Sequence, residues 1–238
     1  MSIPKIVHLS WKQKDIFDNQ APLILNGIRN LKDQNPDWSI GIHDDNDVDL
    51  YLRENLAQLD YELIRGKKMV EKTDLWRLLK VYNEGGLYTD IDRYYNIPLS
   101  ELVTDGIRCV LPTCVEWDFS QDFMLSAPQN PIYKEAIELN LQRRRAGHHQ
   151  TYFLGPQTYM HAVTKVLMGR VIETDPGVEE FQRIREALAQ YPFIRTYREE
   201  LPNNTIVFRH DEAAFKLGNG KSKEEFYAEC GVRHWLDE

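Results

Sequence analysis

The chain has 238 residues, of which 42% are hydrophobic and 28% charged, a composition typical of a folded globular protein with a core of its own. Its net charge of −8 argues against nonspecific nucleic-acid binding, which needs a basic surface. No apolar run approaches the length of a transmembrane helix, and the N-terminus lacks the charged-then-apolar layout of a signal peptide.

Three cysteines, Cys109, Cys114 and Cys230, form an odd set without the spacing of a zinc site. We therefore expect free thiols in a reducing compartment, which predicts a cytoplasmic protein or a catalytic chain acting on the cytoplasmic side. The run 143–145 (Arg-Arg-Arg) is a local basic exception, and we interpret it as a solvated helix end. A site for a phosphate, an acidic substrate or a membrane surface is the alternative.

Strands and helices alternate over the first half of the chain. The first strand is rich in β-formers, and the helix after it has apolar residues at helical spacing and ends at Asn35-Pro36. In chain order we predict a strand at 5–10, a helix at 22–34, a strand at 38–43, an acidic turn at 44–47 and a helix at 48–64.

The clearest helix spans residues 68–84. Its apolar residues fall mainly on one broad face, and Gly85-Gly86 supplies a left-handed stop. The chain then resumes as an extended segment at 87–89 that runs directly into Asp90.

The second half of the chain continues the alternation more loosely. We predict a strand at 108–111, a helix at 131–145 after its Pro start, a helix opened by Gly155-Pro156 through 168, a strand at 203–209 and a short helix at 221–230. No linker or repeat divides the chain. The pattern predicts a single α/β domain with a largely parallel central sheet.

Chemistry-bearing residues follow the extended segment at 87–89. Asp90 and Asp92 lie where ligand clefts form, at the carboxyl end of a strand, and their carboxylates can converge if the backbone bends. Two carboxylates are hard oxygen ligands for Mn²⁺ or Mg²⁺, which in turn bridges phosphate oxygens. Alone, an Asp-x-Asp is weak evidence, because solvated turns produce it often.

The preceding helix strengthens that interpretation. Asp74 and Arg77 stand three residues apart and share one helix face. An ordinary intrahelical ion pair is one interpretation. The second has Asp74 accepting hydrogen bonds from sugar hydroxyls, with Arg77 ordering that carboxylate and reaching sugar or phosphate. Gly85-Gly86 caps the helix and also lets the backbone turn sharply toward Asp90.

The run from Lys72 to Asp92 resembles the signature of the DXD sugar-binding glycosyltransferases. These include glycosyltransferase family 32, the yeast initiating α-1,6-mannosyltransferases, capsular-polysaccharide enzymes and, more distantly, the large clostridial toxins. The shared pattern is Ser/Thr-Asp, an Arg three residues later, a Tyr, a Gly-Gly and then Tyr-x-Asp-x-Asp. This chain matches it without a gap.

The resemblance implies a single GT-A (Rossmann-like) domain over 1–238, with a nucleotide-sugar and metal-binding half at 1–100 and an acceptor-side half at 101–238. It implies transfer of a hexose-type sugar from a nucleotide-sugar, UDP-linked first and GDP-linked second, to a glycan or glycoconjugate hydroxyl. Retention of the anomeric configuration is also implied. The expected cofactor is Mn²⁺, with Mg²⁺ as the alternative.

The start of the chain extends the resemblance. Residues 3–8 followed by Trp11 are similar to the family's opening strand, Ile-Pro-Lys-Ile-Ile-His-x-x-Trp, whose end lies against the nucleotide. This implies donor contacts for His8 and Trp11, with Trp11 stacking on the base. A core or rim aromatic is the alternative for Trp11.

Later segments extend it further. Residues 120–131 are similar to a family segment written Ser-Asn-x-x-Met-x-Ala-x-Pro-x-His-Pro, with Gln121 in place of the common Asn and Asn130 in place of the common His. This implies a donor contact for Gln121. Gly155-Pro156 matches the Gly-Pro that begins a later helix in the family, near the acceptor.

Roles for the acidic site follow from the resemblance. Asp92 would bind the metal directly, while Asp90 would contact the ribose, the sugar and the metal through water. Arg77 would stabilise the departing diphosphate, and Asp74 would orient the sugar. The family often places a His before a Trp near the C-terminus; His234 is the candidate third metal ligand and His210 a second candidate.

Three rival functions stay open on the sequence alone. A haloacid-dehalogenase-type phosphohydrolase also uses Asp-x-Asp after a strand, but it wants a small Thr or Val where this chain has Tyr94. The second rival is a catalytically weak nucleotide-sugar-binding protein. The third is a toxin-like glycosyltransferase that acts on a protein.

Overall fold

The computed structural model describes residues 2–16, 22–95, 98–103, 106–113, 119, 121–168, 199–201, 205–209 and 215–217, together with Glu225 and Ala228. His210, His234, Cys114, Cys230 and most of the predicted helix at 221–230 lie outside the described residues; Glu225 and Ala228 are helical. Cys109 is a buried free thiol, as predicted.

A seven-stranded sheet runs in the order β2-β1-β3-β6-β5-β8-β7. Its strands are β1 (Ile6–Ser10), β2 (Ser39–His43), β3 (Gly86–Thr89), β5 (Cys109–Thr113), β6 (Phe123–Ser126), β7 (Glu199–Leu201) and β8 (Thr205–Arg209). Strands β2, β1 and β3 are mutually parallel, β6 is antiparallel to β3 and β5, and β8 is parallel to β5. Five of the seven strands therefore point the same way, which confirms the predicted α/β fold with a largely parallel sheet.

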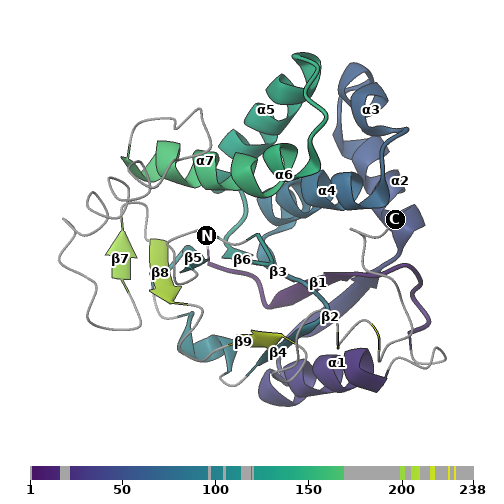
Figure 1. The fold of residues 1–238 in the computed structure, drawn as a ribbon. Coiled ribbons are helices and arrows are strands. Elements are labelled where there is room, and N and C mark those ends of the chain that lie inside the picture. Colours follow the sequence, from purple (N-terminus) through teal and green to yellow (C-terminus); the bar gives the residue numbers. More distant parts are fainter. Residues whose placement is uncertain are drawn as a thin grey trace.

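Helices cover both faces of this sheet (Figure 1). On one face lie α2 (Asp45–Asn55), α3 (Gln58–Ile64), α4 (Met69–Glu84), α5 (Pro131–Arg145), α6 (Thr151–Leu154) and α7 (Pro156–Met168). On the other face lies α1 (Pro22–Gln34), beside a small sheet of β4 (Arg93–Tyr95) and β9 (Phe215–Leu217). A short 3-10 helix spans Leu99–Glu101.

Side-chain alternation along the strands fills two separate cores. In β3, Leu87 packs into the cluster on the α1 side, while Tyr88 packs into the cluster that contains α4. Strand β6 repeats the pattern with Phe123 and Met124. Because successive strand residues point to opposite faces, Tyr88 is directed at α4, where Asp74 and Arg77 lie.

One predicted helix is two helices. The segment 48–64 breaks at Leu56 and Ala57, whose backbones are extended, so that α2 ends at Asn55 and α3 begins at Gln58. The predicted acidic turn is instead a helix start, because Asp44 is the N-cap of α2 and forms a capping box with Asp47.

The arginine run at the end of α5 corrects a second prediction. Arg143 and Arg144 are buried, and only Arg145 is exposed. Arg144 pairs with Glu71 of α4 at 2.9 Å, and Arg143 lies over the ring of Phe153. Two of the three arginines therefore pack between helices, and the run is not a solvated helix end.

No helix among the described residues is both long and apolar enough to cross a membrane.

Candidate functional site

Arg77 and Asp74 form a buried ion pair on the sheet-facing side of α4. Arg77 Nη2 lies 3.0 Å from Asp74 Oδ1, and the two side chains are 9% and 4% exposed. Their spacing of three residues places both on one helix face, as the sequence predicts. Arg77 Nη1 also donates to Asp90 Oδ1 at 3.3 Å, which links α4 to the end of β3.

Tyr88 completes the link between α4 and Asp90. Its hydroxyl donates to Asp90 Oδ1 at 2.8 Å, and the Arg77 guanidinium carbon lies 4.5 Å from the centre of its ring. Burial raises the pKa of Tyr88 well above its ordinary value, so the hydroxyl keeps its proton and acts as a donor. The pattern Tyr-x-Asp-x-Asp in the sequence contains Tyr88, but no role was predicted for it.

Arg77 stays charged in this environment. Burial alone would lower its pKa, but the facing Tyr88, Asp74 and Asp90 oxygens more than offset that effect, and the pKa is raised. Asp74 shows the opposite balance. Its burial raises the pKa to about 6, although Arg77 opposes the rise. The pair is therefore ionised near neutral pH.

Two glycines bring β3 against its neighbours. Gly85 and Gly86 have φ of 70° and 86°, a region that favours glycine. A Cβ on Gly86 would lie 2.4 Å from the carbonyl oxygen of Ile6, and one on Gly85 would lie 2.7 Å from Pro128 Cδ. The Gly-Gly pair therefore ends α4, allows close packing of the backbone, and begins the strand that leads to Asp90.

Asp90 and Asp92 flank a tight bend between β3 and β4. The Arg93 amide donates to the Asp90 carbonyl at 3.3 Å, and the Asp90 amide donates to the Asp122 carbonyl at 2.9 Å. Asp92 is only 2% exposed, and its Oδ1 lies 3.8 Å from Arg93 Nε. Arg93 also pairs with the Asp122 carboxylate. The backbone bend that the two carboxylates need is thus present.

Gln121 joins the cluster from the segment just before β6. Its Nε2 donates to Asp74 Oδ1 at 2.9 Å, and its carbonyl accepts from Arg77 Nη1 at 3.1 Å. Gln121 and Asp122 lie beyond residue 100, so the cluster draws on both halves of the chain.

The donor set of this cluster fits a divalent cation. Four carboxylates lie among two guanidiniums, which leaves an excess of two negative charges; the groups are Asp74, Asp90, Asp92, Asp122, Arg77 and Arg93. Within the described residues, no group of three or more His, Cys, Asp or Glu is arranged to hold a metal. One or two carboxylates suffice for a magnesium-type ion when substrate phosphates complete its shell. His234 and His210, the predicted third ligands, lie outside the described residues.

His8 of β1 lies against the Gly-Gly turn. It is 2% exposed, and its Nε2 is hydrogen-bonded to the Gly85 carbonyl at 3.0 Å. Burial lowers its pKa to about 4, so the ring is neutral and supports the turn. A direct donor contact for His8 stays a prediction.

Trp11 lies just past the end of β1. It is partly buried against the α1-side core, and its amide donates to the His43 carbonyl at 3.0 Å. Trp11 therefore lies at the same sheet edge as Asp90, and stacking of its indole on the base stays a prediction.

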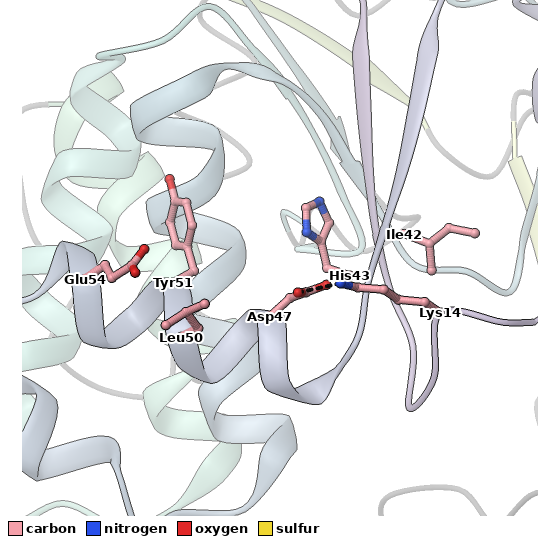
Figure 2. Close-up of a pocket in the computed structure, with 7 residues that line it drawn as sticks. All are labelled: Lys14, Ile42, His43, Asp47, Leu50, Tyr51 and Glu54. Carbon is pink, nitrogen blue, oxygen red and sulfur yellow. Dashed lines mark hydrogen bonds and ion pairs between the residues drawn. The ribbon is translucent and has the colours of Figure 1, made fainter.

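A cavity of about 480 Å³ opens beside the end of β2. Figure 2 shows Lys14 reaching from the loop after β1 to Asp47, with His43 and Tyr51 above them. The Lys14 Nζ–Asp47 Oδ1 distance is 2.7 Å.

Strand register relates this cavity to the acidic cluster. Ser10 of β1 is opposite His43, and His8 is opposite Tyr88, so Asp90 continues at the level of Ser10. Two strand spacings, about 10 Å, therefore separate the cavity's His43 from Asp90 along the same sheet edge. No motif in the sequence marks this cavity.

Comparison with known proteins identifies the segment that carries this site. Residues 23–106 match the family described as "Glycosyltransferase sugar-binding region containing DXD motif". The chain is also 25% identical over 138 residues to inositol phosphoceramide mannosyltransferase 1 of Schizosaccharomyces pombe, covering 57% of this chain. It spans only 42% of the length of that relative.

The fold has a solved counterpart in the PaToxG glycosyltransferase. The two superpose with a TM-score of 0.54 at 17% sequence identity, over 79% of this chain and 75% of that one. The fold is therefore of the GT-A type, and the segment 23–106 is similar to the DXD sugar-binding region of that family.

Proposed function

We propose that this chain is a metal-dependent glycosyltransferase that moves a hexose-type sugar from a nucleotide-sugar to a glycan or glycoconjugate hydroxyl. The observation that carries the proposal is the joining of Asp74, Arg77, Asp90 and Gln121 into one cluster at the end of β3, in which only Asp90 is partly exposed. That cluster lies in the segment that matches the DXD sugar-binding region, with Gln121 added from outside it.

Asp92 and Asp90 are the residues that would hold the metal, and Mn²⁺ or Mg²⁺ suits their oxygen donors. A bound divalent cation would supply charge neutralisation for the diphosphate leaving group. Tyr88 and Arg77 both donate to Asp90 Oδ1, so this carboxylate is held in one orientation before any donor arrives.

Arg77 has a second role in the proposal. Its guanidinium keeps its charge despite burial, and it lies between the helix and the bend that carries the two aspartates. A fixed positive charge at this place stabilises negative charge that develops on a departing diphosphate.

The nucleotide would lie across the ends of β1 and β2. Trp11 is available at the end of β1 to stack on the base, and the cavity lined by Lys14, His43 and Tyr51 offers polar and aromatic groups beside it. A nucleoside diphosphate can bridge the separation of about 10 Å between this cavity and Asp90. UDP is the first choice of nucleotide and GDP the second.

The proposed transfer proceeds with retention. The acceptor oxygen forms a bond to the anomeric carbon on the face from which the phosphate oxygen leaves, and the acceptor proton passes to that phosphate oxygen. No side chain is then required as a separate general base. The division into a donor half at 1–100 and an acceptor half at 101–238 is part of this proposal, with Gln121 and Asp122 as contributions from the second half.

The likeness to a mannosyltransferase makes GDP-mannose a donor to include in the test, and the name of that relative makes an inositol phosphoceramide an acceptor to include.

The proposal is tested with a panel of UDP- and GDP-sugars, with and without Mn²⁺. We expect one donor to raise the melting temperature only when Mn²⁺ is present, and to be hydrolysed slowly without an acceptor. Binding with no hydrolysis and no transfer would instead identify a nucleotide-sugar-binding protein. Transfer to protein but to no glycan or lipid would identify a toxin-like glycosyltransferase. No response to any donor contradicts the proposal.

A further inference from the structure

Arg93 lies beside Asp92, the carboxylate proposed to hold the metal. Its Nε is 3.8 Å from Asp92 Oδ1, and its Nη2 pairs with the carboxylate of Asp122, which comes from the segment just before β6. The side chains of Arg93, Asp92 and Asp122 are 13%, 2% and 8% exposed. One guanidinium therefore faces two buried carboxylates.

The backbone holds these side chains in place. The Asp90 amide donates to the Asp122 carbonyl at 2.9 Å, which fixes the segment before β6 against the bend between β3 and β4. At the end of β4, the Tyr95 amide donates to Asn30 Oδ1 of α1 at 2.7 Å, and Asn30 Nδ2 donates to the Tyr95 carbonyl at 3.1 Å. Arg93 and Asp122 therefore meet from two anchored segments.

The family resemblance gives neither member of this pair a role. Arg93 follows the last aspartate of the pattern Tyr-x-Asp-x-Asp, and Asp122 falls on an undefined position of the pattern that begins Ser-Asn. The pair is therefore a feature of this chain's own sequence.

Arg93 acts on Asp92 through its charge. At 3.8 Å its Nε is too far from Asp92 Oδ1 for a hydrogen bond, and this Nε has no hydrogen-bond partner among the described residues. The positive charge nevertheless offsets part of the negative potential at the buried carboxylate. With Asp122 included, the three ionised side chains carry a net charge of −1.

This charge balance sets a condition on metal binding. A divalent cation at Asp92 would lie close to the guanidinium, and like charges repel strongly where the surroundings screen them poorly. A nucleoside diphosphate brings about two or three further negative charges, and its phosphate oxygens can complete the shell of a magnesium-type ion. The cation then enters a place whose total charge is strongly negative.

We propose that Arg93, held by Asp122, weakens the binding of a free divalent cation at Asp92 and so makes tight metal binding depend on the diphosphate. Arg93 is then a positioning residue that acts through Asp92 and couples the metal to the nucleotide. Such a coupling is reciprocal, so each ligand tightens the binding of the other. This inference rests on the proposed function and gives the Arg93–Asp122 pair a role within it.

The experiment measures Mn²⁺ affinity with and without nucleotide. Free Mn²⁺ is followed by electron paramagnetic resonance in titrations of the wild type and Arg93→Gln, alone and with saturating UDP or GDP. Without nucleotide, we expect Arg93→Gln to bind Mn²⁺ at least about tenfold more tightly, because a repelling charge is lost. With nucleotide, the two proteins should differ by less than about threefold, because Arg93 also attracts the diphosphate.

Two control variants separate charge from shape. Arg93→Lys keeps the positive charge and should stay within about threefold of the wild type in both conditions. Arg29→Gln removes an exposed arginine of α1 and should change neither affinity.

Asp122→Asn guards against a folding defect in Arg93→Gln, since it keeps Arg93 and nearly the same shape. We expect it to weaken Mn²⁺ binding at least about threefold in the presence of nucleotide, because one carboxylate is lost while the Arg93 charge stays beside Asp92.

Three results would overturn the inference alone. They are an Arg93→Gln that gains no Mn²⁺ affinity or gains equally with and without nucleotide, an Arg93→Lys that gains as much as Arg93→Gln, and an Asp122→Asn with wild-type affinity. A wild type that binds Mn²⁺ neither alone nor with UDP or GDP would overturn the proposed function together with it.

Discussion

Replacing Arg77 by Met tests whether the Arg77–Asp74 pair is truly buried and interdependent. Methionine retains much of the side chain's length but leaves Asp74, whose side chain is 4% exposed, with Gln121 as the one remaining hydrogen-bond donor to Oδ1 among the described residues. Removing one partner of a buried ion pair costs about 3–5 kcal/mol, because the remaining charge is stranded. The lost contact to Asp90 adds little, since that side chain is 27% exposed.

Urea denaturation at pH 7 measures the effect. We expect Arg77→Met to lower the free energy of unfolding by about 3–5 kcal/mol. The double variant Asp74→Leu/Arg77→Met should regain most of that loss, because it removes the stranded charge as well. Arg65→Met is the control: Arg65 forms an exposed pair with Glu62 at the same spacing, and its loss should cost under about 1 kcal/mol. A single variant no less stable than this control, or a double variant no better than the single, would refute the reasoning.

Two further predictions concern the Gly-Gly turn. Gly86 and Gly106 have φ of 86° and 87°, but only Gly86 faces a close neighbour, so Gly106→Ala should cost about 1–2 kcal/mol and Gly86→Ala at least about 2 kcal/mol more; equal losses in urea denaturation would contradict the close contact with Ile6. The pKa of His8 is lowered from 6.5 to about 4, so the unfolded chain takes up its proton first, and stability from neutral His8 is lost as pH falls through that window. The difference in unfolding free energy between wild type and His8→Asn should therefore shrink by about 3 kcal/mol from pH 7 to pH 4. Asp74 has a raised pKa and stabilises the folded state in acid, but it is present in both proteins, so its contribution cancels in this difference. A pH-independent difference would show that His8 is not buried as a neutral ring.

Local sequence patterns correctly predicted the helix, the turn and the strand that carry the site residues. The apolar face of α4, the Gly-Gly stop and the short strand before Asp90 are all encoded within a few residues of one another. The spacing of Asp74 and Arg77 likewise predicted a shared helix face. These features depend on helix and strand periodicity, which a single segment determines by itself.

Long-range pairing was not predictable in the same way. Strand β6 and Asp122 just before it were not predicted, because the antiparallel pairing of β6 with β3 depends on residues far apart in the chain. The approach of Gly155 to Asp74 is a contact of the same kind. The prediction that the arginine run is solvated was wrong for a related reason. Its charge suggests exposure to solvent, but Glu71 on another helix supplies a buried partner for Arg144.

The break at Leu56–Ala57 shows a local failure. Neither residue is a glycine or proline, so the apolar spacing continued through it without a stop signal. The acidic residues at 44–47 were placed in a turn because the capping box that begins α2 was not recognised in them.

The measurement that tests the central claim most directly is hydrolysis of the preferred nucleotide-sugar by Asp92→Ala in Mn²⁺. Asp33→Ala, at an exposed position on α1, is the matched control. We expect Asp92→Ala to lose at least about a hundredfold in turnover, the scale of removing a major electrostatic group, while its circular dichroism stays that of the wild type and Asp33→Ala retains full activity. Wild-type turnover in a folded Asp92→Ala would contradict the assignment of Asp92 to the metal and the donor site built around it.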